Sequence, residues 1–264
     1  MTLLGPIAAS SAAQPEPVRI LAAGSLRGVV TELAAEAGPA LGIEVQPSFG
    51  GSGLLRERIE KGEPADLLMS ADLGSPAKLQ AQGRTVVPII AFARNRMCIV
   101  SRRSAGVSAA NLIERLLAPG VRLKTSTPVA DPSGDYAWSI FGKIEALRPG
   151  ARAILERKAQ ASMALSAKPA TLTQSAAAAL FATNAVDMSI TYCSGTAALE
   201  KELPDLTSLV VPAEFDPHPL YGIAVLSARP EVLRLALFLL SQKGQAIIAK
   251  QGLVPLVEPA AGPQ

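Results

Sequence analysis

Four short stretches of the chain place small and hydroxyl-bearing residues where the sequence predicts the start of a helix. The first turn of a helix carries unpaired backbone N–H groups and about half a positive charge, so it attracts an anion. Several such helix starts directed at one point would form an anion site built from amide and hydroxyl donors. The four stretches are Ala23-Gly24-Ser25, Gly50-Gly51-Ser52-Gly53, Asp131-Pro132-Ser133-Gly134 and Thr173-Gln174-Ser175.

The two serines in the first part of the chain occur in the same context, after a predicted strand and before a predicted helix. Ser25 follows the apolar run 18–22, and its side chain suits the N-cap of a helix. Ser52 has a glycine on each side, which lets the backbone approach another group closely. Either serine alone could be only a cap or a turn residue. Because the pattern recurs in successive strand–helix units, we favour a ligand-binding role for both.

Catalytic motifs are weak by comparison. The chain has a single histidine, His218, which lies between two prolines. A serine hydrolase would need it as the base, and the pair considered is Ser52 with His218. The stretch 50–54 lacks the spacing of a nucleophile elbow, and 24–28 falls short of a dinucleotide-binding fingerprint. No cysteine–histidine cluster or spaced aspartate run suggests a metal site. We therefore predict no catalytic residue, no metal and no cofactor, and retain the hydrolase as an alternative.

Strands and helices alternate along the chain, and this order predicts an α/β fold with mostly parallel sheets. In such sheets, ligands bind beyond the carboxyl ends of the strands, where the serine-containing stretches are expected to lie. The predicted strands are 18–22, 42–49, 67–70, 97–100, 122–126, 188–192, 208–211 and 221–226, and the predicted helices are 26–40, 54–61, 75–82, 111–117, 135–146, 151–158, 175–182, 196–203 and 231–250, the last broken near 243–244.

The chain changes character after the strand at 97–100, which indicates a second α/β unit. The chain is expected to return to the first unit near Leu220. Two such units facing each other would enclose a cleft lined by the loops that follow their strands. The predicted organisation is a leader at 1–17, a discontinuous first lobe at 18–96 and 225–258, a second lobe at 97–224 and a tail at 259–264.

Composition limits the classes of partner. Of the 264 residues, 49% are hydrophobic and 18% are charged, so the chain can bury a large core. The net charge of +3 is small and the basic residues are scattered, which argues against nucleic-acid binding.

No stretch reaches the roughly 18 apolar residues of a membrane span. Residues 3–14 are similar to the end of an export signal but lack its basic start, so we expect an exported protein with an incomplete signal peptide.

The two cysteines, Cys98 and Cys193, both lie in apolar, strand-like runs. Free cysteine is among the most buried residue types, so we expect two buried free thiols. Their spacing leaves a disulfide open as the alternative.

The order of the motifs resembles the periplasmic molybdate-binding proteins of ABC importers, within the type II solute-binding fold. The likeness extends from about Val18 to Val254 and is strongest in the first 100 residues. Segment 148–173 departs from the family pattern. The matching motifs are 21–26, 48–53 and 62–72, of which the last is the most specific, followed by 132–137 and 190–192 in the second lobe.

The resemblance implies a two-lobed protein that closes on an oxyanion. Ser25 and Ser52 match the two serines that bind the anion in that family, and Tyr192 matches its tyrosine. Ser133 stands where an alanine amide donates, and Gln174 where a second main-chain amide does. The Ser133 hydroxyl is an addition to the family pattern. All these donors are neutral, so they would hold a dianion without a counter-charge.

The predicted function is therefore to bind molybdate in the interlobe cleft as a periplasmic monomer. The protein would deliver the anion to an ABC permease in the inner membrane. The same fold could instead bind tungstate, sulfate or a small organic anion. A hydrolase that uses Ser52 and His218 is the alternative from another class.

Overall fold

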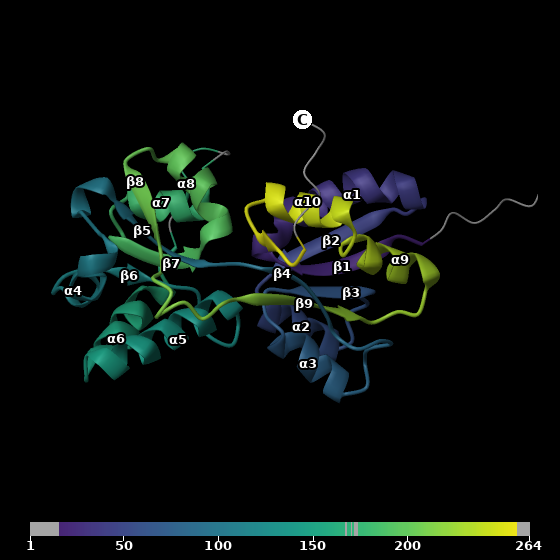
Figure 1. Ribbon diagram of the computed structural model, residues 1–264, viewed down its shortest axis with the longest axis horizontal. Helices are drawn as coiled ribbons and strands as arrows, with labels where there is room; N and C mark the ends of the chain where they lie inside the picture. The colour runs from purple at the N-terminus through teal and green to yellow at the C-terminus, as the bar shows by residue number, and fades with distance from the viewer. Residues whose placement is uncertain (1–15, 167, 170, 172–173, 258–264) are drawn as a thin grey trace, which may run out of the picture.

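The computed structural model describes residues 16–166, 168–169, 171 and 174–257, which form two lobes (Figure 1). The predicted leader at 1–17, apart from residues 16 and 17, and the whole predicted tail at 259–264 lie outside the described residues. The first lobe contains β1 (Val18–Ala23), α1 (Arg27–Leu41), β2 (Val45–Gly50), α2 (Ser52–Glu60), β3 (Leu67–Ser70), α3 (Gly74–Ala81), β4 (Ile90–Arg94), β9 (Leu220–Val225), α9 (Pro230–Phe238), α10 (Gln242–Lys250) and β10 (Val254–Pro255). The second lobe contains β5 (Met97–Arg102), α4 (Leu112–Leu117), β6 (Leu123–Lys124), α5 (Pro132–Leu147), α6 (Ala151–Met163), α7 (Ala176–Ala182), β7 (Met188–Tyr192), α8 (Thr196–Glu202) and β8 (Leu206–Val210).

Each lobe is built on a mixed sheet flanked by helices, which is the predicted fold class. The strand order is β10-β4-β9-β3-β1-β2 in the six-stranded sheet and β6-β7-β5-β8 in the four-stranded sheet. The pairs β1–β2, β1–β3 and β6–β7 are parallel. The pairs β3–β9, β4–β9, β10–β4, β5–β7 and β5–β8 are antiparallel. The sheets are therefore less parallel than predicted. The strand β9 and the unpredicted strand β4 add antiparallel pairs to the first sheet, and β5 is antiparallel to both of its neighbours in the second.

Two segments connect the lobes, and both can be followed from one lobe to the other (Figure 1). The first is the short link between β4 and β5, which contains Asn95 and Arg96. The second leads from β8 to β9. Strand β9 pairs with β3 and β4 and belongs to the first sheet from Leu220 onward, before the boundary at 225 that the sequence suggested. The amide of Asn95 donates to the Pro219 carbonyl over 3.0 Å, which joins the two connections.

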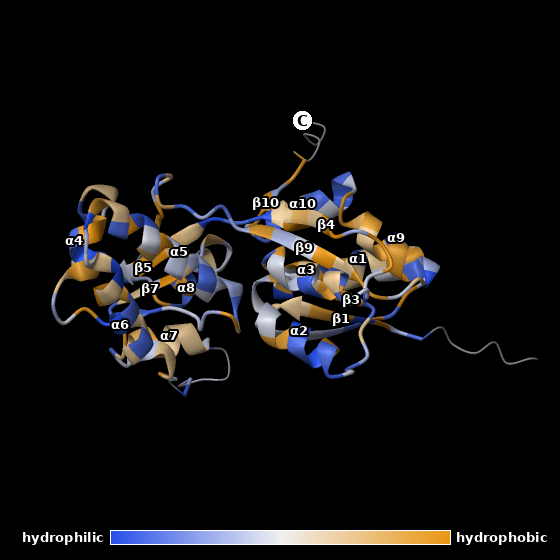
Figure 2. Ribbon diagram, turned by 90° about the horizontal axis from the view of Figure 1, so that it is seen from below, coloured by the Kyte–Doolittle hydropathy of each residue, from blue (hydrophilic) through white to orange (hydrophobic). Residues whose placement is uncertain are grey.

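Helix α1 shows how the sequence builds the first lobe. Val29, Val30, Leu33 and Ala37 are buried, at the spacing of an amphipathic helix. The helix ends at Gly42, whose φ of 66° is the left-handed conformation that glycine adopts most readily at a helix end. Figure 2 shows the contrast between the hydrophilic α2 and the largely hydrophobic α9.

Helices α9 and α10 pack against α1. Among the described residues, no single helix is long and apolar enough to cross a membrane. The pair α9 and α10 passes that test only together, and it is bent by 60° at the break between the helices.

A disulfide bond joins Cys98 of β5 to Cys193, which directly follows β7. Strands β5 and β7 are antiparallel neighbours, and their pairing brings the two Cα atoms to 5.0 Å. The expectation of two free thiols is therefore wrong. Disulfides persist in oxidising compartments, so the bond agrees with an exported protein.

Candidate functional site

A cavity of about 540 Å³ lies between the two lobes. The first lobe borders it with the loops after β1 and β2 and with Gln251. The second lobe borders it with Ser126, Asp131 and Ser133 near the start of α5, and with residues of the segment from Thr191 to Ala198. The carboxyl ends of β1, β2 and β7 thus meet at one place, as expected for ligand sites in open α/β sheets.

Three of the five predicted site residues border this cavity, namely Ser25, Ser133 and Tyr192. Ser25 belongs to the first lobe and the other two to the second. Ser25 is more than 100 positions from each of the other two residues in the chain, and the fold brings them together.

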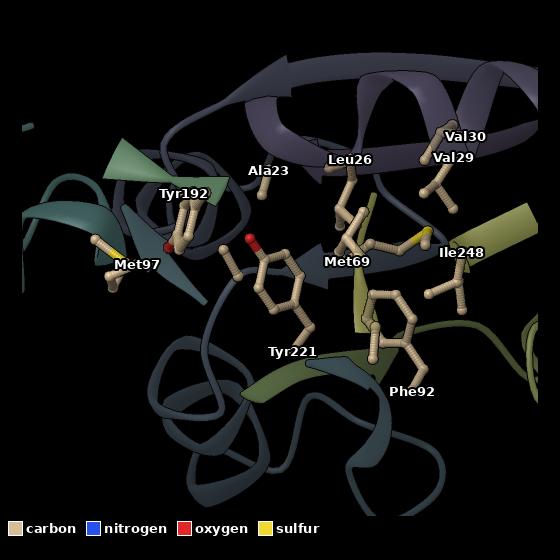
Figure 3. Packing of buried hydrophobic residues seen from close by; sticks show 14 of the residues in the cluster. Ala23, Leu26, Val29, Val30, Met69, Phe92, Met97, Tyr192, Tyr221 and Ile248 are labelled. Carbon is tan, nitrogen blue, oxygen red and sulfur yellow. The ribbon is translucent and has the colours of Figure 1, made fainter. Parts of the chain in front are cut away.

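The hydroxyls of Ser133 and Tyr192 are buried and have no hydrogen-bond partner among the described residues. The Tyr192 ring packs edge to face against Tyr221, with ring centroids 5.7 Å apart, and against Tyr136 at 6.3 Å. Figure 3 shows Tyr192 and Tyr221 beside each other where the lobes meet. A buried hydroxyl without a partner costs about 1–3 kcal/mol. Two of them bordering one cavity are explained if a ligand completes their hydrogen bonds.

The phenols at the site stay protonated. Burial raises the pKa of Tyr192 well above its ordinary value, and the neighbouring Tyr221 raises it further. Burial also raises the pKa of Tyr221, and it raises the pKa of Tyr136 to about 12. All three therefore remain neutral at physiological pH, and the unpartnered hydroxyl of Tyr192 keeps a proton to donate.

A hydrogen-bonded chain of side chains leads to Ser25. The Ser25 Oγ and the Tyr221 hydroxyl are 3.0 Å apart. The Nδ2 atom of Asn95 donates to the Tyr221 hydroxyl over 3.0 Å and to the Ser194 Oγ over 2.9 Å. The Oδ1 atom of Asn95 accepts from the Arg96 amide, which fixes the orientation of the side-chain amide. Neither Asn95 nor Tyr221 was identified from the sequence.

This network fixes the direction of the two hydrogen bonds that Asn95 makes through its Nδ2 atom. An amide nitrogen only donates, so the hydroxyls of Tyr221 and Ser194 accept from Asn95. In the contact between Ser25 and Tyr221 either hydroxyl can donate. When Tyr221 donates its single proton to Ser25, the hydroxyl protons of Ser25 and Ser194 remain for the cavity, which both residues border. The network therefore presents donors to a ligand, and donors favour an anion.

Two charged groups that were not predicted as site residues also border the cavity. Arg27, in the first turn of α1, places its guanidinium over the Phe49 ring at 4.2 Å. Asp131 caps α5 and accepts from the Ser133 amide over 3.0 Å. That amide is thus already bonded within the protein, although the family resemblance assigned it to the ligand. Burial raises the pKa of Asp131. The prediction of neutral donors did not include these two charged groups.

The other two predicted residues do not border the cavity. Ser52 is fully buried, and its Oγ accepts from the Ala71 amide over 3.0 Å, which links the start of α2 to the end of β3. The Gln174 amide donates to the Thr171 carbonyl oxygen, 3.3 Å away, in the segment before α7. The side chain of His218 is 73% exposed and lies 3.6 Å from the Asp216 carboxylate, so Ser52 and His218 have different partners.

The glycines beside Ser52 let the lobes touch. A Cβ atom on Gly53 would overlap the Val129 carbonyl oxygen, and one on Gly51 would overlap that of Ala130. The Leu54 amide donates to the Ala130 carbonyl over 3.3 Å. Tyr136 donates to the Ala71 carbonyl over 3.2 Å, also between the lobes. The lobes are therefore in direct contact at the edge of the cavity.

The part of the chain that the structure describes holds no group of three or more histidine, cysteine, aspartate or glutamate side chains suited to a metal ion. The side chains that border the cavity offer hydroxyl groups, the Gln251 amide, the Arg27 guanidinium and the Asp131 carboxyl group.

Comparisons with known proteins identify the family to which this chain is similar. A family model described as bacterial extracellular solute-binding protein matches residues 18–254. The chain is 35% identical over 244 residues to the uncharacterized protein PM1146 of Pasteurella multocida, covering 90% of this chain and 98% of that protein.

Two solved structures share the fold at lower identity. The periplasmic molybdate-binding protein of Azotobacter vinelandii has a TM-score of 0.70 at 20% identity, covering 90% of this chain and 98% of that chain. The sulfate-binding protein SubI of Mycobacterium tuberculosis has a TM-score of 0.72 at 17% identity, covering 91% of this chain and 87% of that chain. The family model covers nearly the whole described chain, and we conclude that this chain belongs to the bacterial extracellular solute-binding proteins.

Proposed function

We propose that the protein captures a small tetrahedral oxyanion, molybdate in the first place, in the cavity between its lobes. The observation that carries the proposal is the pair of buried, unpartnered hydroxyls of Ser133 and Tyr192, which border the same cavity as Ser25. Ser25 comes from the opposite lobe, so an anion bound to all three would hold the lobes together.

Hydroxyl donors and one cation would stabilise the anion. A hydrogen bond to a charged partner contributes about 1.5–3 kcal/mol, and the proton chain from Asn95 leaves Ser25 and Ser194 free to donate. The guanidinium of Arg27 adds positive charge at the edge of the site. These groups favour a compact dianion with four acceptor oxygens.

Discrimination among anions would rest on size and protonation. Molybdate and tungstate share the tetrahedral shape, whereas sulfate is smaller, so sulfate would span fewer donors. A protonated oxyanion such as hydrogen phosphate presents a hydrogen to a site made mainly of donors. The carboxylate of Asp131 is the one acidic group at the cavity that could accept that hydrogen.

Delivery to an ABC permease in the inner membrane is the role that follows for a solute-binding protein. The family description is extracellular, and the Cys98–Cys193 disulfide suits an oxidising compartment such as the periplasm. Fold relatives named for molybdate and for sulfate support an anionic solute. Closure of the lobes on the anion would give the permease a shape that differs from the empty one.

The test is a binding screen on the oxidised protein. Molybdate, tungstate, sulfate and phosphate are compared by thermal shift and then by calorimetry. We expect saturable binding of molybdate and tungstate with one site per chain, and weaker binding of sulfate and phosphate. Absence of saturable binding by all four anions would refute the proposal.

A further inference from the structure

A second cavity of about 670 Å³ adjoins the first and extends into the second lobe. The two cavities share bordering residues, among them Gly51, Asp131 and Thr191. A ligand in the first cavity that carried a substituent past these residues would therefore place it in the second. Bare molybdate does not need this space.

The walls of the second cavity are largely apolar. Leu180, Phe181, Val186 and Leu199 all border it and belong to one hydrophobic cluster of the second lobe. Ligand sites in proteins are often of this size and combine apolar walls with a few polar groups. The surface chemistry therefore suits an apolar body.

Lys124 and Glu202, two of the charged residues at this cavity, are already hydrogen-bonded to backbone groups. The ammonium group of Lys124 donates to the carbonyls of Ser162, Met163 and Leu165, over 2.8, 2.7 and 3.3 Å. These three bonds use all three of its protons. The carboxylate of Glu202 accepts from the Ser175 amide over 2.8 Å. Lys124 therefore has no proton left to donate to a second ionic group of a ligand.

One buried polar atom at this cavity lacks a hydrogen-bond partner among the described residues. Thr125, which follows β6, is 2% exposed, and its Oγ1 has no hydrogen-bond partner among the described residues. It borders the second cavity. A buried hydroxyl without a partner is costly, so its presence at an apolar cavity points to a ligand with one polar atom at that position.

We propose that the second cavity receives an apolar organic group carried by the oxyanion, so that the protein also binds compact organic oxyanions such as sulfonates and phosphonates. The anionic head occupies the first cavity, against Ser25, Ser133 and Tyr192, and the organic group lies between α7 and α8. This inference rests on the proposed function, because the head group uses the same hydroxyls.

The first experiment compares the affinity of paired ligands for the wild-type protein by calorimetry. Benzenesulfonate is compared with methanesulfonate, and phenylphosphonate with methylphosphonate, with molybdate and sulfate alongside. We expect each aryl ligand to bind about tenfold more tightly than its methyl partner, because it buries more apolar surface. Equal or weaker binding of both aryl ligands would overturn the inference.

The second experiment fills the cavity. Ala177 of α7 borders the second cavity but not the first, and the Ala177→Phe substitution would occupy part of its volume. Ala182, exposed at the end of the same helix and bordering neither cavity, gives the matched control Ala182→Phe. We expect the ratio of benzenesulfonate to methanesulfonate affinity to fall about tenfold in Ala177→Phe and to stay at the wild-type value in the control. Equal ratios in the two variants would overturn the inference.

The third experiment examines Thr125. We expect Thr125→Val to raise the unfolding temperature of the ligand-free protein, because it removes a buried hydroxyl that lacks a partner. One isomer of hydroxybenzenesulfonate should bind wild type more tightly than benzenesulfonate, and lose this advantage in Thr125→Val. An advantage that persists in the variant would contradict the role of Thr125.

The experiments distinguish a failure of this inference from a failure of the proposed function. If molybdate or sulfate binds and no aryl ligand does, the inference falls while the proposed function stands. If neither the inorganic nor the organic anions bind, the proposed function fails and the inference fails with it.

Discussion

The side-chain oxygens of Ser25 and Tyr221 lie 3.0 Å apart, and this contact links the loop after β1 to the strand that returns from the second lobe. Asn95, in the other connection between the lobes, donates to Tyr221 and to Ser194. One amide group thus orients hydroxyls from both lobes. The polarity of the anion site depends on a residue that does not itself border the cavity.

Asn95→Asp should weaken anion binding by at least about tenfold, a loss near 1.4 kcal/mol. Aspartate keeps the size of asparagine but replaces the two N–H donors with an acceptor, so Tyr221 would donate to it and no longer to Ser25. Calorimetry with molybdate measures the change. Tyr221→Phe, which removes the same link without adding charge, should also lower the affinity. Wild-type affinity in both variants would exclude the orienting role of this network.

Tyr192→Phe should separate binding from stability. The Tyr192 hydroxyl has no hydrogen-bond partner in the part of the chain that the structure describes, so its removal should leave the unfolding temperature of the ligand-free protein unchanged or higher. Molybdate affinity should fall about tenfold, because one hydrogen bond to the anion is lost. A variant that loses stability but keeps its affinity would contradict the assignment of this hydroxyl to the ligand.

Ser25→Ala and Ser52→Ala should behave differently. Ser52 accepts from the Ala71 amide inside the first lobe, so its loss leaves a buried N–H unpaired and should lower the free energy of unfolding by about 1–3 kcal/mol. Ser25 borders the cavity, so its loss should weaken anion binding with a smaller effect on unfolding. Urea denaturation and calorimetry on both variants provide the comparison. Identical profiles would show that the two serines share one role.

Asp131→Asn should strengthen binding of a dianion at neutral pH. Removing a negative charge near the anion relieves repulsion of about 1–4 kcal/mol at 4 Å, depending on the effective dielectric constant. For the wild type, affinity should increase as the pH falls and Asp131 takes up a proton, whereas the variant should lack this dependence. Calorimetry with sulfate, which stays a dianion in this range, tests both statements. A pH dependence that is the same in the variant would assign it to another group.

The same substitution has a predicted sign for stability. Burial raises the pKa of Asp131 above the ordinary value of 3.8, so the folded protein binds this proton more tightly than the unfolded chain does. The contribution of Asp131 to stability therefore declines as the pH rises through the interval between the two pKa values. Asparagine also caps helices well, so Asp131→Asn should be more stable than wild type at neutral pH. Lower stability of the variant at pH 7 would count against this account.

Gly53→Ala should prevent the lobes from touching as they do here. Its Cβ would overlap the Val129 carbonyl oxygen. The Cβ is fixed to the backbone and the oxygen is part of it, so neither atom can move away by rotation of a side chain. We expect a larger radius of gyration by small-angle X-ray scattering with molybdate present, and an affinity at least about tenfold lower. Gly142→Ala, where a Cβ meets no atom within 4 Å, is the matched control.

The sequence predicted local structure well where periodicity was strong. The spacing of Val29, Leu33 and Ala37 indicated α1, and the runs 67–70 and 188–192 matched β3 and β7. Strand β4 was missed because its five residues show no alternation, with Phe92 and Ala93 buried side by side. Antiparallel insertion of β9 depends on a return from the other lobe, which local patterns do not encode.

The candidate site was predictable only in part. Ser25, Ser133 and Tyr192 stand out as polar residues at strand or helix ends, and the structure places all three at the cavity. Asn95 and Tyr221 act through contacts across 126 positions, which no spacing reveals. The Asp131 cap did have a signal, since aspartate before proline is typical of a helix start. The disulfide joins cysteines 95 positions apart and needed the pairing of β5 with β7.

Cys193 stands between Tyr192 and Ser194, so the covalent link to β5 anchors the segment that supplies two hydroxyls to the cavity. How the protein is made therefore matters to every assay above. Material purified from a reducing cytosol would lack this anchor, and a weak signal from it would report on preparation rather than on ligand choice. Secretion into an oxidising compartment, with thiol titration before each measurement, gives samples in which the anchor is in place.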